Sequence, residues 1–410
     1  MNKIKNNIKH GLLPLIFGVV VLSSCNKDVQ QFPLPPITQA VGISLDSTLK
    51  TTDNDSMYYR LIVKASLGPT NFVNILRGAA NPNNRYTLFV PDNAAMIASG
   101  LSSAVITALP VASAIGIVSY NVIPQVYDTA SIPNVFPNFP VGTSIFPSPT
   151  AAPFLTFRTF PSKRPSILRV NTLPMTTPLN VRATNGIIHH VAGVIAPPAQ
   201  SLLWNRIDTD VTPSTGLTYL KAAIIRADSA SNGGGLARPG ALEAALTNGA
   251  ANLTVFAPTD AVFQGTLTAL ITQGLIAQGV PPAVAAAQAS ALASSPTVFS
   301  NPLLFGTLSS MTVRGILVYH VMTNTVFAVN FPAAPTKYPT LLNTAIASHP
   351  GVELQATFAG PFVSAATIKG VGNATAANLI INGAAAPNGS SDQFYINGTL
   401  HKITQLLIPQ

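Results

Sequence analysis

The chain has 410 residues, of which 47% are hydrophobic and only 9% are charged, against about 25% charged in ordinary soluble domains. This length allows about two or three domains with sizeable cores, and the low charge suits an extracytoplasmic protein whose surface is mostly Thr, Ser, Asn and backbone. An integral membrane protein is excluded for the body of the chain, because its apolar runs are interrupted well short of ~20 residues. The net charge of +9 is spread without a Lys/Arg cluster, which excludes a nucleic-acid-binding face and is compatible with a weak attraction to acidic polysaccharide.

The N-terminal segment is typical of a lipoprotein signal. Residues 1–10 are basic, and residues 11–22 form an apolar run that is too short for a stable membrane span. The run ends in Leu22-Ser23-Ser24-Cys25, which resembles the bacterial lipobox, where a lipid is attached to the cysteine. Cys25 is the only cysteine, so it has no disulfide partner within the chain. We therefore predict a signal peptide at residues 1–25 and a membrane anchor on Cys25; the alternative is a free thiol.

Residues 26–46 are expected to form a tether. Asn26-Lys27-Asp28 resembles the surface-export signal of Bacteroidetes lipoproteins, and several prolines between residues 33 and 36 favour an extended chain. These features predict a secreted protein that is lipid-anchored in the outer membrane and exposed at the cell surface.

Two short amphipathic helices are predicted next, over Met57–Leu67 and Asn71–Leu76, from the spacing of their apolar residues. The block Thr87–Met96 (TLFVPDNAAM) follows. It predicts a buried strand that ends at a proline, because proline cannot donate to a sheet, and then a capped helix start. A helical region is expected over Ala94–Ala108.

Further along the chain, Tyr120 precedes Asn121. We expect Tyr120 to be a core aromatic residue with a hydrogen-bonded hydroxyl rather than a residue that contacts a ligand. Strands are predicted over residues 154–160, 166–170 and 178–182. Asn185-Gly186 then indicates a tight turn into a last strand that carries His189.

Residues 199–212 are predicted to link two domains. The segment is short and apolar, so we expect it to hold the domains in a fixed mutual orientation. It carries the only tryptophan, Trp204, for which packing between the domains and simple exposure are both open.

The second half repeats the first. Gly216–Ala227 repeats the opening helix, and Thr254–Phe263 (TVFAPTDAVF) repeats the strand-proline-helix block at an offset of 167 residues. This offset indicates a duplicated domain, because small solenoid repeats have periods of about 20–50 residues. We expect Thr259 or Asp260 to cap the following helix. An Ala-rich helix predicted over Ala283–Ala293 accounts for most of the extra length of this half.

Tyr319-His320 lies within Ile316–Val321, whose alternation predicts a strand with one buried face. Further strands are predicted over residues 352–354, 365–368 and 378–381. Asn397-Gly398 then leads into a final strand that carries His401.

Three blocks in each half resemble the signatures of the fasciclin-like (fasciclin I) domain family. The first, Thr-x-Phe-Ala-Pro-(Ser/Thr)-(Asp/Asn)-x-Ala-Phe, includes Asn93 and Asp260. The second is a Tyr-His pair, intact as Tyr319-His320 but changed to Tyr120-Asn121 in the first half. The third is an Asn-Gly-Val-Ile-His block, matched by Asn185, Gly186 and His189 and by Asn397, Gly398 and His401.

The resemblance covers residues 47–198 and 213–409 and implies an α+β fold of two tandem fasciclin-like domains, each a β-wedge or sandwich flanked by short helices. We place these domains at residues 47–198 and 213–410. In this family the Tyr-His region is implicated in integrin-type adhesion. The resemblance therefore makes Tyr319, His320, Tyr120 and Asn121 the candidate binding residues, and Asn121 leaves open whether the first domain binds.

Catalytic and metal-binding signatures are absent from the sequence. There is no Gly-x-Ser-x-Gly, His-x-x-x-His or Cys-x-x-Cys pattern, and His189 and His190 point to opposite faces of one strand, so they cannot chelate one metal together. Sparse acidic residues argue against a two-carboxylate glycosidase. We predict no enzymatic activity, no metal site and no cofactor.

We expect His320 and His401 to be satisfied inside the second domain, by Asp260 or by a backbone carbonyl; the alternative is a ligand-facing patch. On the structural interpretation, replacing His320 by Ala lowers the melting temperature. As a whole, the sequence predicts a protein that mediates adhesion to other cells, to matrix or to polysaccharide. Its expected ligand is a surface protein or a polysaccharide, and no nucleic-acid partner is expected. The alternative is an accessory glycan-binding lipoprotein beside an outer-membrane nutrient receptor.

Overall fold

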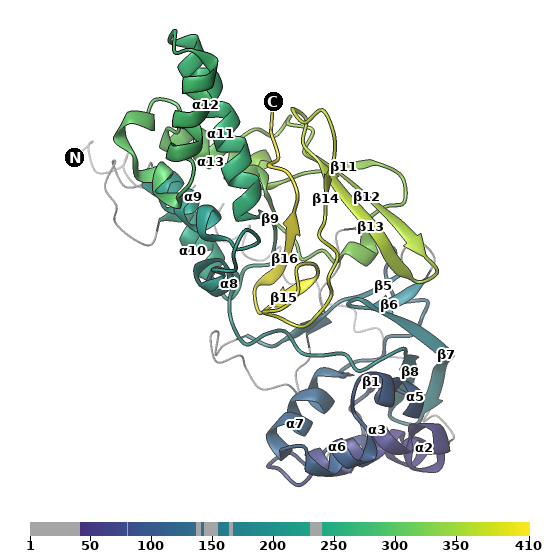
Figure 1. Cartoon of the computed structure of the whole chain (residues 1–410). Coiled ribbons are helices and arrows are strands. Elements are labelled where there is room, and N and C mark those ends of the chain that lie inside the picture. Colours follow the sequence, from purple (N-terminus) through teal and green to yellow (C-terminus); the bar gives the residue numbers. More distant parts are fainter. Residues whose placement is uncertain (1–41, 80, 137–140, 143–154, 164–166, 230–239) are drawn as a thin grey trace, which may run out of the picture. The chain divides into compact units, whose positions relative to one another are not determined.

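The computed structural model describes residues 42–79, 81–136, 141–142, 155–163, 167–229 and 240–410 (Figure 1). The predicted signal segment, Cys25 and most of the tether lie outside these residues. All of the described residues belong to one unit, Gly42–Gln410. Within the described part of the chain, no helix is both long enough and apolar enough to cross a bilayer.

The first half begins with short helices and then forms a sheet. The helices are α2 (Leu45–Thr51), α3 (Ser56–Ala65), α4 (Phe72–Arg77), α5 (Asn93–Ala98), α6 (Ser103–Ala108) and α7 (Val111–Tyr120). The strands are β1 (Tyr86–Pro91), β2 (Val122–Ile123), β3 (Val141–Gly142), β4 (Arg158–Thr159), β5 (Pro161–Lys163), β6 (Leu168–Val170), β7 (Leu173–Ala183) and β8 (Gly186–Val191). The helix predicted over Ala94–Ala108 is thus two helices, because Gly100 adopts a left-handed conformation (φ +81°) after α5.

The second half repeats this order, with longer helices after its first central strand. Its helices are α8 (Leu203–Thr209), α9 (Thr218–Asp228), α10 (Ala241–Thr247), α11 (Asp260–Ala277), α12 (Pro282–Leu292) and α13 (Ser310–Tyr319), with short 3-10 turns η4 (Pro296–Ser300) and η5 (Pro302–Leu304). Its strands are β9 (Leu253–Pro258), β10 (Val321–Met322), β11 (Thr336–Tyr338), β12 (Val352–Ala359), β13 (Phe362–Lys369), β14 (Ala377–Asn378), β15 (Gln393–Tyr395) and β16 (Gly398–Ile403).

The two halves pair their central strands in the same register. β1 runs parallel to β8, which places Phe89 opposite His189. β9 runs parallel to β16, which places Phe256 opposite His401. In each half a short strand, β2 or β10, pairs antiparallel with the other edge of the first strand. The duplication predicted from the sequence is therefore present in the fold.

The sheets of the two halves extend differently beyond this centre. The first half has a six-stranded sheet in the order β2-β1-β8-β7-β6-β5 and a small β3-β4 pair, whereas the second half has two four-stranded sheets, ordered β10-β9-β16-β15 and β11-β12-β13-β14 (Figure 1). A bridge between Leu379 and Ile403 joins the two sheets of the second half. Each half is thus an α+β domain, as the sequence predicts.

The central strand of each half is buried on both faces. In β1, Leu88 and Val90 join the helical core, whereas Phe89 points to the core on the other side of the sheet. In β9, Val255 packs with the helices and Phe256 with the second sheet. Because successive side chains of a strand point to opposite faces, this alternation explains why both blocks are apolar throughout.

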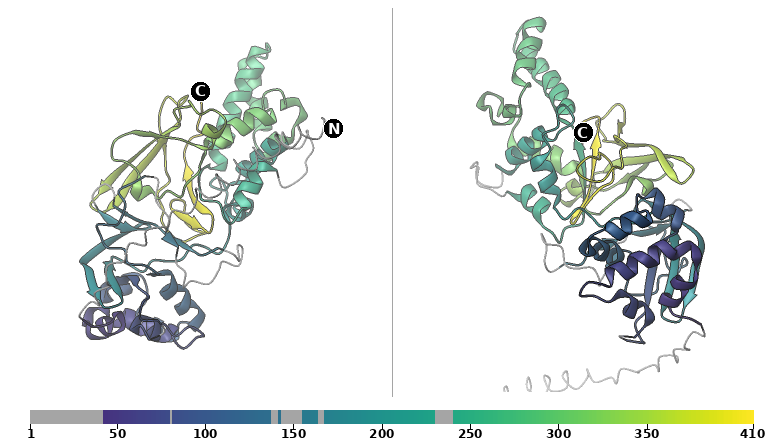
Figure 2. Two further views of the ribbon diagram at one scale, coloured as in Figure 1. Left: turned by 180° about the vertical axis from the view of Figure 1, so that it is seen from behind. Right: turned by 60° about the horizontal axis from the view of Figure 1, so that its bottom comes forward.

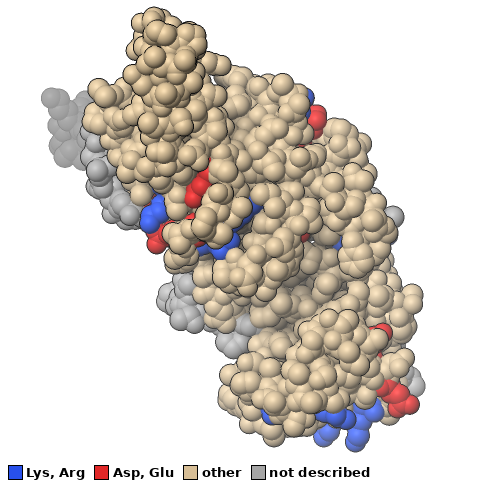
Figure 3. Space-filling model, in the orientation of Figure 1, with Lys and Arg blue, Asp and Glu red and all other residues tan. Residues whose placement is uncertain are grey.

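Helices α11 and α12 pack side by side as a hairpin (Figures 1 and 2). The predicted Ala-rich helix is α12, and its buried residues are Ala285 and Ala289, four residues apart on one helical face. From Ala261 to Val313 the sequence contains no Asp, Glu, Lys, Arg or His. Figure 3 accordingly shows this hairpin without charged side chains on the face in view.

The strand predicted over Ile316–Val321 is wrong. α13 runs to Tyr319, His320 follows as its C-cap, and only the next two residues pair as β10. The buried residues Val313 and Leu317 have helical spacing, which the β-branched and aromatic residues of this short segment conceal. α7 ends in the same way at Tyr120.

The segment 199–212 is not a plain linker, because it contains α8. The side-chain oxygen of Asn397 accepts from the amide of Leu203 at the start of α8, as Asn185 accepts from the amide of Leu45 at the start of α2. α8 is therefore the first helix of the second half. Trp204 is buried in the helical core of that half, so simple exposure is the wrong alternative.

The two halves contact each other through aromatic rings and one buried arginine. Phe160 packs against Phe327 and Phe394, with ring centroids 5.6 and 5.7 Å apart. Arg169 Nη2 donates a 2.7 Å hydrogen bond to the carbonyl of Pro361, beside the turn between β12 and β13. These contacts bury side chains from strands that lie far apart in the sequence.

Candidate ligand-binding site

The Asn-Gly turns anchor the first helix of each half to the last strand. Asn185 accepts from the Leu45 amide at 2.9 Å and donates to the Leu76 carbonyl at 2.8 Å. Asn397 accepts from the Leu203 amide at 2.9 Å and donates to the carbonyl of Leu246 at 2.8 Å. Both asparagines are buried. The following Gly186 and Gly398 leave no room for a Cβ, which would lie 2.2 and 1.9 Å from a backbone carbonyl oxygen.

The histidines of the two last strands have equivalent partners. Nε2 faces a loop carbonyl: His189 is 2.7 Å from Tyr127 O, and His401 is 2.9 Å from Val326 O. Nδ1 accepts a backbone N–H from Asn180 or Asp392, and both of these residues are left-handed, with φ of 55° and 52°. A histidine that accepts at Nδ1 carries its proton at Nε2, so both rings are fully satisfied. Burial is the main cause of the lowered pKa of His189.

The tyrosines of the second signature are held by their hydroxyls. Tyr120 donates to the Arg158 carbonyl at 2.7 Å, and Tyr319 donates to the carbonyl of Gly351 at 2.6 Å and accepts from the amide of Val371 at 3.1 Å. Burial raises the pKa of Tyr319. Tyr120 therefore ties the end of α7 to β4, and Tyr319 ties the end of α13 to the residue before β12.

His320 and Asn121 occupy equivalent positions after α13 and α7. His320 donates from Nδ1 to the Ile316 carbonyl at 2.8 Å and accepts from the Leu407 amide at 2.9 Å. Asn121 donates to the carbonyls of Ile117 and Ile195 at 2.7 and 3.1 Å. Asn121 thus replaces the histidine as a link between the helix end and the segment after the last strand.

The four residues that the resemblance offers as binding candidates are all buried, which favours the internal roles expected for Tyr120 and His320. Tyr120, Asn121 and Tyr319 are 0% exposed and His320 is 1% exposed. Most of their polar atoms bond to the backbone partners described above, and Asn121 Oδ1 is buried without a partner among the described residues, so these side chains support the framework of each half.

Asp260 and Asn93 also have equivalent roles, which differ from the predicted cap. Asp260 accepts from the amide of Tyr219 at 2.9 Å, at the start of α9, and Asn93 accepts from the Met57 amide at 2.9 Å, at the start of α3. The Thr259 side chain makes no capping bond to α11. Each residue therefore caps a neighbouring helix rather than its own. Backbone carbonyls, and not Asp260, accept from His320 and His401.

His190 points away from His189, as the strand geometry requires. Its Nε2 lies 2.9 Å from Asp55 Oδ1, and both side chains are buried. Burial disfavours the imidazolium, but Asp55 outweighs it and the pKa of His190 is raised. Among the described residues, no three His, Cys, Asp or Glu side chains are grouped closely enough to hold a metal ion.

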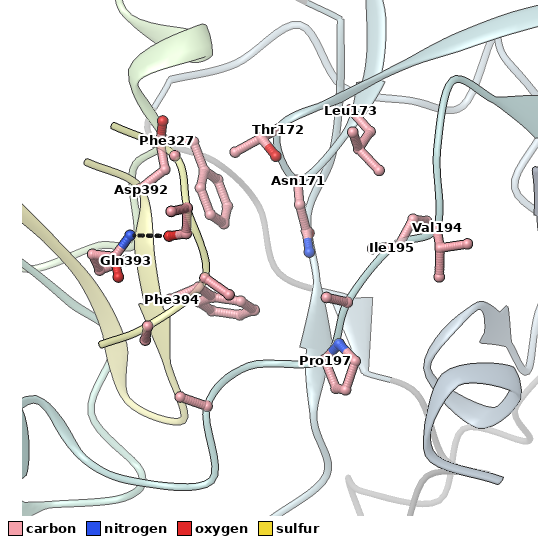
Figure 4. A pocket seen from close by; sticks show the side chains of 16 residues that line it. Asn171, Thr172, Leu173, Val194, Ile195, Pro197, Phe327, Asp392, Gln393 and Phe394 are labelled. Carbon is pink, nitrogen blue, oxygen red and sulfur yellow. Dashed lines mark hydrogen bonds between the residues drawn. The ribbon is translucent and has the colours of Figure 1, made fainter. Parts of the chain in front are cut away.

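A pocket of about 410 Å³ lies between the two halves (Figure 4). One wall carries Phe327 and Phe394 from the second half, and Asn171, Val194 and Ile195 from the first half lie opposite. The loop 383–386 and residue 199 complete the lining. We call this cavity the inter-half pocket.

The polar groups of the inter-half pocket are held by internal hydrogen bonds. Asn171 donates to Tyr120 Oη at 3.0 Å and accepts from the Phe160 amide at 3.0 Å. Gln393 Nε2 donates to the carbonyl of Ala384 at 2.8 Å, while its Oε1 is buried without a partner among the described residues. Asp392 accepts from the Ala328 amide, and burial raises its pKa. Aromatic rings beside amide groups suit binding of a hydroxylated ring.

Sequence reasoning missed this pocket. Its walls come from several segments of both halves that are distant in the sequence, and their packing against each other has no local pattern. The available signal was Phe394, an aromatic residue three positions before the second Asn-Gly turn.

Comparison with known families identifies the first half. Residues 59–197 match the model of the fasciclin domain. This part of the chain is a fasciclin domain. The second half repeats its strand register, its Asn-Gly anchor and its histidine partners, and is therefore a structural repeat of this domain.

Two further comparisons complete this result. No functionally curated protein matches the chain. A solved structure, described as a FAS1 domain pair from the insect cell adhesion molecule fasciclin I, aligns with 87% of this chain and 98% of that chain, at 13% identity and a TM-score of 0.29. A TM-score of this size does not by itself establish a shared fold.

Proposed function

We propose that this tandem fasciclin-like protein is a non-enzymatic adhesion protein. The observation that carries the proposal is that the motif residues of both copies serve the internal framework. Asn, His and Tyr side chains that elsewhere perform chemistry are here buried and bonded to backbone groups. A duplicated framework of this kind suits attachment rather than turnover.

Attachment at the cell surface also requires an anchor. The proposed anchor is a lipid on Cys25, followed by a tether that ends near residue 46, where the first described helix has begun. A lipid chain contributes about 0.8 kcal/mol for each buried methylene. We propose that the two domains are thereby held at the outer membrane and face outward.

The proposed ligand is a surface protein or polysaccharide that contacts the inter-half pocket. The pocket combines two phenylalanine rings with amide groups and has little net charge. This composition also favours the second candidate, an accessory glycan-binding lipoprotein of a nutrient-uptake system, because a sugar ring offers an apolar face and several hydroxyls.

The test compares cells that carry the full chain with cells that carry Ala385→Trp, a substitution that fills the inter-half pocket at an exposed position. We expect the wild-type protein to retain cells on matrix- or polysaccharide-coated surfaces, and Ala385→Trp to lose most of this retention. Ala374→Trp, exposed outside the pocket, is the matched control. A glycan array on the purified full chain separates the candidates, since the glycan-binding role requires a saccharide that Ala385→Trp no longer binds.

Protease treatment of intact cells tests the location. We expect loss of the wild-type protein from the cells, together with a known surface protein, and release of Cys25→Ser into the medium.

In the adhesion test, retention of adhesion by Ala385→Trp would reject the pocket as the ligand site. No retention on any surface by the wild-type protein would reject adhesion itself.

A further inference from the structure

We infer that a second pocket, within the second half alone, binds a carboxylate that carries an apolar chain or ring. The pocket has a volume of about 470 Å³ and lies between α9 and the segment that contains η4 and η5. We call it the α9 pocket. This inference does not depend on the adhesive role.

The walls of the α9 pocket are mainly apolar. Ile225 contributes from α9, and Pro296, Phe299 and Phe305 contribute from the opposite segment. Phe299 is buried, while Phe305 is partly exposed at 38%. A cavity with these walls gains free energy when an apolar group displaces water from it.

One charged side chain, Arg226, lines the pocket. Its Nε donates to the Leu308 carbonyl at 2.9 Å, and its guanidinium carbon lies 3.7 Å from the centroid of the Phe305 ring. No described Asp or Glu forms an ion pair with Arg226. The guanidinium is therefore fixed in place with its charge uncompensated, which favours a bound anion.

One wall of the α9 pocket, the segment with η4 and η5, has no counterpart among the described residues of the first half. η4 and η5 lie in the charge-free stretch from Ala261 to Val313. An apolar wall without carboxylates, next to a single cation, selects ligands with one negative charge and an apolar body. A carboxylate matches the planar fork of arginine.

The test uses decanoate and decanol, two probes with equal chain length that differ in charge, below the critical micelle concentration of decanoate. We expect the full chain to bind decanoate more tightly than decanol by at least tenfold in isothermal titration calorimetry. Arg226→Met keeps an apolar stem over Phe305 and removes the charge, so it should weaken decanoate at least tenfold and leave decanol unchanged.

Two variants control this experiment. Arg60→Met, an exposed position on α3, should leave both affinities unchanged. Ile225→Glu places a carboxylate in the pocket wall and should abolish decanoate binding. Equal affinity of the wild-type protein for decanoate and decanol, decanoate affinity unaffected by Arg226→Met, or no binding of either probe would each overturn the inference.

Discussion

At the scale of single residues, Asn121 and His320 make equivalent links with different side chains. Both tie the end of a helix to the segment after the last strand. The amide of Asn121 does not titrate, whereas the imidazole of His320 does. Burial lowers the pKa of His320 from 6.5 to about 4, so the folded protein holds this ring neutral.

This difference predicts an acid-dependent loss of stability. As the pH falls below 6.5, the unfolded chain takes up a proton at position 320 and the folded chain does not until about pH 4. The free energy of unfolding should therefore fall by about 3 kcal/mol between pH 7 and pH 4 because of this residue. His320→Asn introduces the residue that the first half has at the equivalent position, Asn121. It should reduce the pH-dependent loss of the free energy of unfolding by that amount.

Urea denaturation at pH 7 and pH 4, monitored by the fluorescence of Trp204 in the second core, measures the effect. His320→Ala, which leaves the Leu407 amide without its acceptor, should destabilise the protein at both pH values. The same pH dependence in wild type and His320→Asn would contradict the assignment of the acid sensitivity to His320.

At the scale of elements, α8 is fixed to β16 by a buried ionic cluster. Asp210, directly after α8, lies 2.8 Å from Arg206 and 2.6 Å from Lys402 of β16. Burial opposes ionisation of Asp210, but Lys402 and the other partners outweigh it and lower the pKa of the carboxyl. The cluster contains two cations and one anion, so Asp210 is the counter-ion on which both cations depend.

Asp210→Asn should destabilise the second half strongly, because it leaves two buried cations without a counter-ion. The expected loss is about 3–5 kcal/mol in the free energy of unfolding. Asp208→Asn is the matched control, since Asp208 pairs with Lys221 in a half-exposed ion pair worth at most about 1 kcal/mol. Urea denaturation followed by Trp204 fluorescence compares the two variants; losses of equal size would show that the cluster is not essential.

The elements that the sequence predicts well are those with local signals. Both strand-proline-helix blocks, both Asn-Gly turns and the Ala-rich helix appear where expected. The sequence does not predict α8, because the residues that stabilise this helix are distant in the sequence. Asn397 caps its start, and Lys402 pairs with Asp210 at its end. The end of α13 was taken for a strand because six residues are too few to separate the two periods.

The candidate site was less accessible from the sequence than the fold. Sequence signatures located the histidines and tyrosines correctly but could not show that their polar atoms are turned inward to backbone groups. The inter-half and α9 pockets depend on which strands and helices pack together. Such packing cannot be predicted from the hydrophobic periodicity of the segments that line the pockets.

At the scale of the whole molecule, the two halves share a buried cluster of aromatic rings. Phe160 of the first half contacts Phe327 and Phe394 of the second half, and Asn330 donates to Ser162 Oγ at 2.8 Å beside them. Phe160 is 1% exposed, so much of its burial depends on the other half. We therefore expect the halves of the wild-type protein to unfold together.

Phe160→Ala should separate the unfolding of the two halves. Removing the ring leaves a cavity against Phe327 and Phe394, with an expected loss of about 3–5 kcal/mol. In the wild type, thermal transitions followed by circular dichroism and by Trp204 fluorescence should coincide, because Trp204 reports the second half and circular dichroism reports both halves. In Phe160→Ala a separate transition without a fluorescence change should appear. Phe362→Ala, at a ring that is 57% exposed, should behave as wild type; coincident transitions in Phe160→Ala would show that these rings do not couple the halves.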